Sequence, residues 1–157
     1  MKKQKGFSLI ELLIVVAIIL IIAAIAIPNL LKSKMAANES SAVGSLRTIN
    51  TGEVTFAAGC PSVGFSTALN ELNAGSAACP TGQGIIDAAL ATGTKSGYQF
   101  AYTPGVADAS GVISTYTITA TPLTPNTTGT RYFFTDQTGV IRYGANSAAT
   151  AASSALQ

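Results

Sequence analysis

Histidine and tryptophan are both absent from the 157 residues, and only 10% of the residues are charged. Histidine is the most frequent general base in enzymes and the commonest metal-binding side chain. The glycine-rich stretch Gly82-Gln83-Gly84 lacks the lysine and the spacing of a phosphate-binding loop. No two carboxylates have a spacing suited to acid–base catalysis. We therefore expect a protein that is not an enzyme and that has no cofactor and no metal site.

The distribution of charge gives no sign of nucleic-acid binding. The formal net charge is +2, and three of the nine basic residues, Lys2, Lys3 and Lys5, stand at the N-terminus. Without these three, six basic and seven acidic side chains remain. Because a nucleic-acid-binding protein usually carries a clustered basic face, we predict no direct nucleic-acid site.

One long apolar run dominates what the chain does contain. From Phe7 to Ile27 there are twenty-one residues, of which only Ser8 and Glu11 are polar. A helix needs about 20 apolar residues to cross the ~30 Å hydrocarbon core of a membrane, so the run predicts a membrane-spanning helix. An ionisable group in such a helix costs on the order of 2.5–3.5 kcal/mol near the centre of the bilayer. Glu11 is therefore a candidate functional residue.

The sequence Lys5-Gly6-Phe7-Ser8-Leu9-Ile10-Glu11, with a basic leader before it and Pro28 after the apolar run, resembles the processing signal of the type IV pilin family. The resemblance implies that a prepilin peptidase cleaves between Gly6 and Phe7 on the cytoplasmic side, and that a methyltransferase then modifies the new amine of Phe7. It implies a helical homopolymer with these helices in its core, for which Glu11 and Pro28 are the assembly residues. Further implied partners are an inner-membrane platform, an assembly ATPase and an outer-membrane secretin. The similarity is close over about the first 58 residues and holds only in outline beyond them.

In that family, a glutamate at the position of Glu11 neutralises the N-terminal amine of a neighbouring subunit. The charges alone give the same expectation, because a carboxylate about 4 Å from the Phe7 ammonium is worth roughly 4 kcal/mol at an effective dielectric constant near 20. Three alternatives remain open. Glu11 could only cap its own helix, the run could be a secretory signal peptide cleaved near Ala24-Ile25-Ala26, or it could be a plain single-pass anchor. The length of the run and its early acid argue against a signal peptide, and a plain anchor leaves Gly6 and Glu11 unexplained.

The two cysteines, Cys60 and Cys79, each stand directly before a proline in a loop-like sequence. Such a pair indicates a disulfide formed in an oxidising compartment, and closing a loop of about 20 residues would contribute ~3 kcal/mol. Two free buried thiols are the alternative. We expect a precursor that crosses the inner membrane once, with its N-terminus in the cytoplasm and its head in the periplasm, and that later joins an extracellular filament.

Pro28 removes a hydrogen-bond donor, which predicts a kink or local melting around Ala24–Pro28. A helix end at Pro28 is the alternative, but the helix-forming residues after it favour continuation to about Ala58. The predicted core face of this second half consists of Ala42, Leu46, Ile49, Glu53 and Phe56. The predicted polar back consists of Asn38, Glu39, Ser45, Arg47 and Thr48.

Residues 59–97 predict a connecting region with two short helices, one capped by Ser66 or Thr67 and running through Leu72, the other over Ile85–Ala91. After it, apolar residues alternate with polar ones, which is typical of half-buried strands. The predicted strands are Tyr98–Thr103, Thr115–Thr121, Arg131–Thr135 and Val140–Tyr143, and residues 136–139 suit a hairpin turn between the last two. An antiparallel meander packed against the helix gives the fold class α+β.

Two further patterns carry little weight. Asp108 and Asp136 are too few and too far apart for a calcium site. The segments Asn38-Glu39-Ser40 and Asn126-Thr127-Thr128 match the glycan-acceptor pattern, which is a weak signal over three residues.

The predicted organisation is a leader at residues 1–6, a membrane and filament-core helix at 7–28, its amphipathic continuation at 29–58, the connecting region at 59–97, a sheet at 98–143 and a flexible tail at 144–157. We interpret the chain as a structural subunit of a type IV pilus, with adhesion, motility and DNA uptake as candidate roles. A type II secretion pseudopilin and a membrane-anchored binding or adhesion domain that does not polymerise are the alternatives.

Overall fold

The computed structural model of the chain describes residues 6–145 and 147–156. The predicted leader therefore lies outside the described residues, except for Gly6. The chain divides into two compact units, one ending at Lys34 and one beginning at Met35. We call the second unit, residues 35–156, the head.

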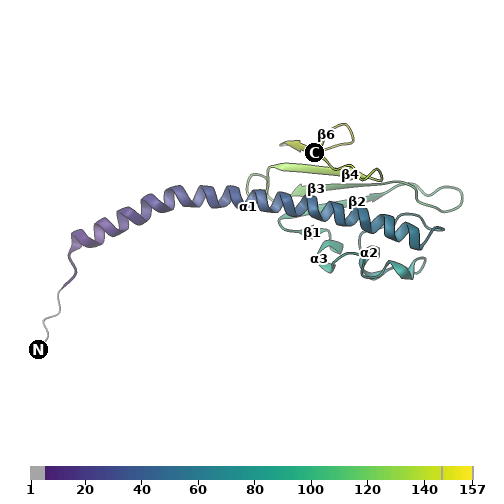
Figure 1. Cartoon of the computed structure of the whole chain (residues 1–157), viewed down its shortest axis with the longest axis horizontal. Coiled ribbons are helices and arrows are strands. Elements are labelled where there is room, and N and C mark those ends of the chain that lie inside the picture. Colours follow the sequence, from purple (N-terminus) through teal and green to yellow (C-terminus); the bar gives the residue numbers. More distant parts are fainter. Residues whose placement is uncertain (1–5, 146, 157) are drawn as a thin grey trace, which may run out of the picture. The chain divides into compact units, whose positions relative to one another are not determined.

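The first helix, α1 (Leu9–Gly59), contributes residues to both units (Figure 1). It is continuous through residues 24–28, so the local melting that Pro28 predicts is absent from this structure. Proline removes only its own hydrogen bond to the carbonyl one turn earlier, and the aliphatic residues on both sides keep theirs. The helix ends where Gly59 is followed by Cys60 and Pro61, as the sequence predicts.

The head contains one antiparallel sheet in which every strand pairs with the next along the chain. The four predicted strands are all present, as β2 (Tyr98–Pro104), β3 (Tyr116–Pro122), β4 (Arg131–Asp136) and β5 (Arg142–Ala145). Buried and more exposed residues alternate along β3, which confirms the period of two. Two short edge strands, β1 (Thr94–Lys95) and β6 (Ser154–Ala155), extend the sheet. The fold is α+β, as predicted.

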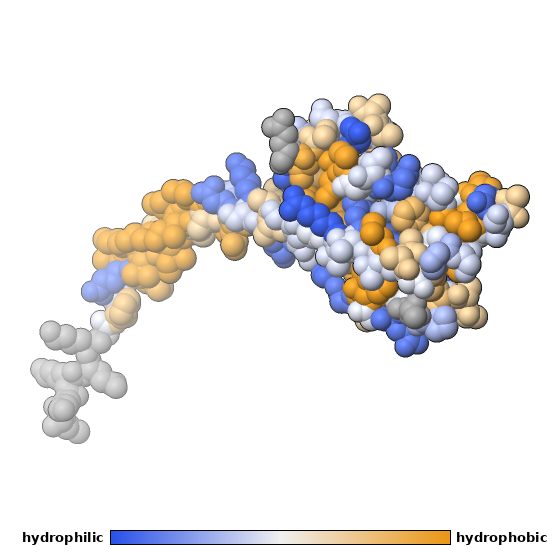
Figure 2. Space-filling view, turned by 45° about the vertical axis from the view of Figure 1, so that its right-hand side comes forward, coloured by the Kyte–Doolittle hydropathy of each residue, from blue (hydrophilic) through white to orange (hydrophobic). Residues whose placement is uncertain are grey.

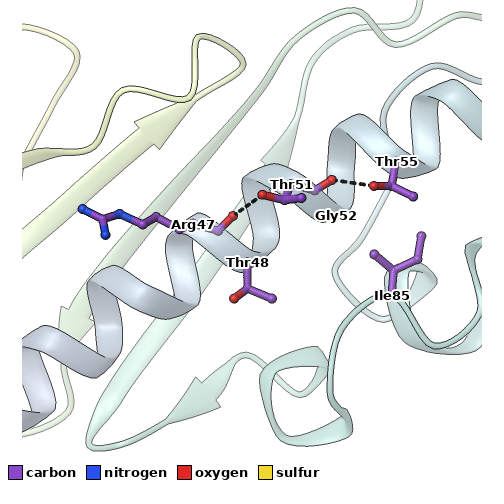
Figure 3. A pocket seen from close by; sticks show the side chains of 6 residues that line it. All are labelled: Arg47, Thr48, Thr51, Gly52, Thr55 and Ile85. Carbon is purple, nitrogen blue, oxygen red and sulfur yellow. Dashed lines mark hydrogen bonds between the residues drawn. The ribbon is translucent and has the colours of Figure 1, made fainter.

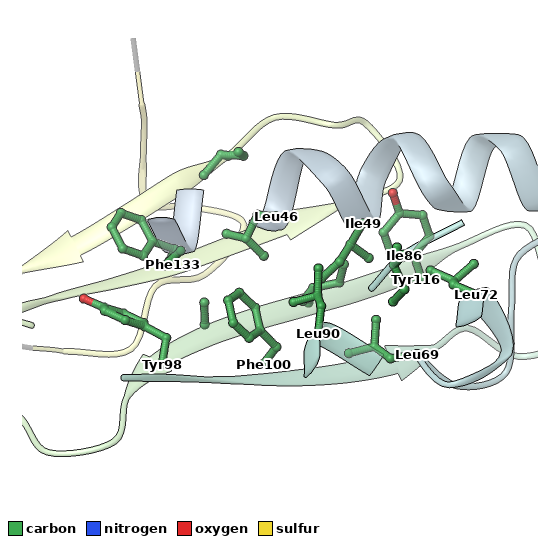
Figure 4. Packing of buried hydrophobic residues seen from close by; sticks show 14 of the residues in the cluster. Leu46, Ile49, Leu69, Leu72, Ile86, Leu90, Tyr98, Phe100, Tyr116 and Phe133 are labelled. Atoms are coloured by element: carbon green, nitrogen blue, oxygen red, sulfur yellow. The ribbon is translucent and has the colours of Figure 1, made fainter. Parts of the chain in front are cut away.

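The core lies between one face of this sheet and the second half of α1 (Figure 4). Leu46, Ile49 and Phe56 of α1 are buried, and the bulky sheet residues Tyr98, Tyr116 and Phe133 are almost fully buried with them. The predicted core face of α1 is therefore confirmed, Glu53 included. The predicted polar back is only partly right: Arg47 and Thr48 are exposed, whereas Glu39 and Ser45 are buried.

The connecting region closes one side of the core with α2 (Glu71–Ala74), the 3-10 helix η1 (Pro80–Gly82) and α3 (Ala88–Ala91). Both predicted short helices exist but are shorter than expected. Ser66 does not cap α2, because its backbone amide and hydroxyl both bind Glu53. The cap of α3 is Asp87, whose carboxylate accepts the Leu90 amide at 2.8 Å.

The segment after β5 has more order than its composition predicts. Its strand β6 pairs with β5, and the Leu156 amide donates to the Ile141 carbonyl at 2.7 Å. The Arg142 guanidinium also donates to the Ser153 carbonyl at 3.0 Å. These contacts are made by backbone groups of the segment. They cannot be predicted from its small side chains, which show no apolar periodicity.

Candidate functional site: the apolar N-terminal segment and the polar anchors of the head

One hydrogen bond of a capping box lies at the N-terminal end of α1. Ser8 directly precedes the helix, and its backbone amide donates to Oε2 of Glu11 at 2.9 Å. A carboxylate at the third helical position that accepts the amide of a serine cap is the reciprocal half of this motif. The capping role of Glu11 is therefore present in the structure. Its other oxygen, Oε1, has no hydrogen-bond partner among residues 6–145 and 147–156.

The apolar segment, residues 7–31, is uncovered in the isolated chain. Its large aliphatic side chains are exposed, and Phe7 keeps 78% of its surface accessible. Figure 2 shows this hydrophobic surface along the N-terminal part of α1. By length and composition, α1 can cross a membrane. Exposure on this scale is typical of a surface that a membrane or another subunit covers.

In the head, Glu39 joins α1 to the start of β4. Its Oε1 accepts the Thr130 amide at 2.8 Å, the Thr130 hydroxyl at 3.0 Å and the Arg131 amide at 3.2 Å, and its Oε2 accepts Arg131 Nε at 2.7 Å. Burial raises the pKa of this carboxyl, but the hydrogen bonds from Thr130 and Arg131 outweigh it, so the pKa lies below its ordinary value. Glu39 is thus a buried ionised anchor, where the sequence predicts a solvent-facing residue.

Asn50 provides a second polar anchor near the middle of the interface between α1 and the sheet. Its amide nitrogen donates to the Thr135 hydroxyl at 2.9 Å, and its amide oxygen accepts the Tyr116 hydroxyl at 3.1 Å. All three groups are buried. Because each buried polar group finds a partner, the network fixes the position of α1 on β3 and β4 at little cost in desolvation.

Glu53 is the third anchor and joins α1 to the connecting region. It is 0% exposed, and it accepts the Ser66 amide at 2.9 Å and the Ser66 hydroxyl at 2.6 Å. The Tyr102 hydroxyl donates to the Ser66 carbonyl at 2.9 Å, which holds the same residue from the other side. Burial raises the pKa of Glu53 above its ordinary value, because the hydrogen bonds from Ser66 only partly offset the loss of water.

The outward side of α1 in the head carries a shallow hollow of about 390 Å³, lined by Arg47, Thr48, Thr51, Gly52, Thr55 and Ile85 (Figure 3). Thr51 and Thr55 donate their hydroxyls to carbonyls one turn earlier in the helix, at 3.0 Å and 2.9 Å. Ile85 packs closely on Gly52, since a Cβ at this position would lie 3.1 Å from Ile85 Cγ2. With the hydroxyls of the threonines engaged, Arg47 is the main free donor of the hollow.

A disulfide joins Cys60 and Cys79, as the sequence predicts. Their Cα atoms are 5.8 Å apart, and the two residues are 19 positions apart in the sequence. Cys60 directly follows α1 and Cys79 directly precedes η1, so the bridge ties the end of the long helix to the connecting region.

The two acids considered for calcium each stabilise their own turn. Asp108 accepts the amides of Ser110 and Val112, and Asp136 accepts the amide and the hydroxyl of Thr138. In the described part of the chain, no three side chains of the metal-binding types come together.

Sequence reasoning missed two of these anchors. It placed Glu39 on the exposed side of α1 and assigned no role to Asn50. In the sequence, each of them is only a polar residue next to an apolar position of the helix. Residues that face solvent show the same pattern. Sequence reasoning also gave Ser8 no role, although Ser8-Leu9-Ile10-Glu11 has the spacing of a capping box and this signal could have identified it.

Known proteins are similar to this chain in its N-terminal segment, the same part in which the structure has an exposed apolar helix. Residues 1–27 match the family of the prokaryotic N-terminal methylation motif. The type IV major pilin protein PilA of Myxococcus xanthus is 48% identical over 54 residues, which are 34% of this chain and 24% of that protein. The type IV wide pilus major component PilA4 of Thermus thermophilus is 60% identical over 40 residues, which are 26% of this chain and 30% of that protein.

The similarity thus spans less than a third of the length of either relative. No solved structure matches the chain. The chain thus resembles type IV pilins in its N-terminal segment, and that segment begins a long helix whose second half packs on a small antiparallel sheet.

Proposed function

We propose that the chain is a prepilin, cleaved after Gly6, whose mature form polymerises through its apolar helix into a type IV pilus. The observation that carries the proposal is the methylation motif over residues 1–27, which includes most of the exposed apolar segment and its one carboxylate, Glu11. A prepilin peptidase, a methyltransferase and other copies of the chain are its proposed partners. The inner-membrane platform, the assembly ATPase and the secretin are expected on the same grounds.

The chemistry of the N-terminus supports a role for Glu11 between subunits. Cleavage would leave the Phe7 amine charged at the start of an apolar helix, where it needs a carboxylate close by. Glu11 uses only Oε2 in its own capping box, so Oε1 remains available to the amine of a neighbouring chain. Such a pair at about 4 Å is worth roughly 4 kcal/mol at an effective dielectric constant near 20, which favours assembly over dispersal in the membrane.

Before assembly, we place the chain as a single span of the inner membrane with the head in the periplasm. The disulfide between Cys60 and Cys79 supports an oxidising compartment for the head. After assembly, the head would stand on the surface of an extracellular filament. Adhesion, motility and DNA uptake are roles that such a filament could serve.

Both related proteins are described as major pilus components, which favours a pilus over a type II secretion pseudopilus. Electron microscopy of sheared cell-surface filaments, labelled with an antibody against the head, tests this choice. Long labelled extracellular fibres are expected. Labelled material confined to the cell envelope would support the pseudopilin or an anchored domain that does not polymerise.

A further inference from the structure

We propose that the membrane-bound precursor has a fixed depth, in which Glu11 lies at one membrane–water interface and Lys32 and Lys34 bind anionic lipid head groups at the other. The inference rests on the proposed single membrane span. It adds a partner, the phosphate groups of lipids. It also adds a register, by which we mean the depth of each helix residue in the membrane, and the processing motif does not specify this depth.

The spacing of charges along α1 supports this register. Glu11 and Lys32 are separated by the twenty uncharged residues from Leu12 to Leu31. These residues are helical throughout, so at 1.5 Å per residue they span about 30 Å. That length equals the typical hydrocarbon thickness, about 30 Å. The helix can therefore fill the hydrocarbon with no charged group inside it, and Glu11 becomes buried only when subunits assemble.

The two lysines have no acidic partner in the part of the chain that the structure describes. Both are exposed, and the ion pairs there join Lys95 to Asp87 and Arg131 to Glu39. The acid that follows them along α1, Glu39, is already engaged by Thr130 and Arg131. Lys32 and Lys34 therefore carry unpaired positive charge directly after the last apolar residues.

Their angular positions indicate a partner that surrounds the helix. Residues two apart in an α-helix are separated by about 200° around its axis, so Lys32 and Lys34 project to nearly opposite sides. A protein packed on one side of the helix would meet only one of them. A layer of anionic head groups meets both, and the flexible lysine stems can lie along the lipid while the ammonium groups reach the phosphates.

The absence of tryptophan makes this depth measurable, because one introduced tryptophan is then the sole indole. Leu30 is 70% exposed and lies two residues before Lys32, so Leu30→Trp places the probe near the proposed interface. The full chain would be reconstituted in phosphatidylcholine vesicles with and without phosphatidylglycerol. Quenching by lipids brominated near the head group or near the chain end then reports the depth of the indole.

We expect strongest quenching of Leu30→Trp by shallow bromines in the anionic vesicles. Adding Lys32→Gln and Lys34→Gln should shift the maximum toward deep bromines, and high salt should give a smaller shift in the same direction. Two matched controls, Lys32→Arg with Lys34→Arg and the single change Arg47→Gln, should leave the depth unchanged.

Strongest quenching by deep bromines with the lysines intact, or a depth independent of both lysines and of phosphatidylglycerol, would overturn the lipid contact. Quenching by aqueous iodide alone would show that the segment does not span the bilayer, which removes the register and the proposed membrane precursor together. If cells that produce the unaltered chain form no filaments containing it, while the depth in vesicles is as expected, the result would count against the proposed function and leave the register standing.

Discussion

The carboxylate of Glu11 can make two contacts. Its Oε2 caps α1, and its Oε1 can bind the amine of a neighbouring chain. Glutamine has the same shape and can still accept the Ser8 amide, but it carries no charge. We predict that Glu11→Gln leaves insertion into the membrane intact and abolishes most filament assembly, because the Phe7 ammonium would lack a partner in an apolar core. The measurement is the ratio of sheared filament to membrane-bound subunit by immunoblot.

Co-expression with the wild-type chain is the matched control for Glu11. A variant subunit can still present its Phe7 amine to a wild-type carboxylate, so partial incorporation is expected. Normal fibres in normal amount from Glu11→Gln alone would leave the capping box as the sole role of this residue.

Gly6 is a residue whose importance the fold does not explain. A Cβ at this position meets no atom within 4 Å, so the folded chain tolerates a larger residue there. Any requirement for glycine must then arise where the peptidase approaches the backbone. We predict that Gly6→Val yields a stable chain that keeps its leader, detected as a slower-migrating subunit. Normal cleavage of Gly6→Val would show that the peptidase accepts a side chain here.

Glu39 and Glu53 are buried carboxyls whose neutral variants should behave differently. In Glu39→Gln, the new amide group that replaces Oε2 would face Arg131 Nε, so two donors oppose each other. In Glu53→Gln, the amide can donate to the Ser66 hydroxyl, which rotates to accept, while the remaining oxygen keeps the Ser66 amide. We predict that Glu39→Gln lowers the free energy of unfolding of the head by about 2 kcal/mol at neutral pH and that Glu53→Gln costs much less.

The pH dependence of the two variants follows from the direction of each pKa shift. The pKa of Glu39 is lowered on folding, so its stabilisation is present above the ordinary carboxyl pKa and is lost as the pH falls through the folded value. The pKa of Glu53 is raised, so its contribution is fullest at low pH and is lost as the pH rises through the folded value. Urea unfolding of residues 35–157 over a pH series should therefore show the deficit of Glu39→Gln shrinking in acid. A deficit that stayed constant down to the acid limit would contradict the role of the ionised carboxylate.

At the scale of elements, the disulfide joins the end of α1 to the connecting region, two parts of the head that are otherwise linked covalently only along the backbone. It links the residue after α1 to the residue before η1, and it closes a loop with a sequence separation of 19. The chain-entropy account gives about 3 kcal/mol for a loop of this size, which corresponds to roughly 10 °C in the melting temperature of a domain of this length. Calorimetry of residues 35–157 with and without reductant measures the effect. Equal melting temperatures would mean that the bridge adds no stability.

The elements that the sequence predicts best are those with a strong periodic pattern. The apolar run, the core face of α1 and the alternation in β3 all follow from the spacing of apolar residues. The strands it misses, β1 and β6, contain two residues each and are defined by backbone pairing to a neighbouring strand. No side-chain period can reveal so short an element.

The polar anchors are harder to predict from the sequence, for a different reason. Glu39 is buried because Thr130 and Arg131, about ninety residues later in the chain, supply four hydrogen bonds to it. That partnership is a property of the tertiary fold, and helix periodicity assigns Glu39 to solvent. At the N-terminus, by contrast, Glu11 and Ser8 lie within one turn, and helix capping by Glu11 is one of the alternatives that the sequence leaves open.

At the scale of the whole molecule, the chain combines a compact head with an apolar segment whose large aliphatic side chains are exposed. The buried carboxylates Glu39 and Glu53 find their hydrogen-bond donors within the head, whereas in the apolar segment the aliphatic side chains are exposed and Glu11 Oε1 has no partner among the described residues. We expect this difference in a subunit whose head is stable by itself and whose apolar helix is covered by membrane lipid or by other copies of the chain.

The most direct test of this account is mass spectrometry of the subunit in filaments sheared from cells that produce the unaltered chain. The account predicts that this chain is the filament protein, that its first residue is Phe7, and that the Phe7 amine carries a methyl group. A mature chain that begins near Ile27, or filaments that lack this chain while it remains in the membrane, would contradict the account.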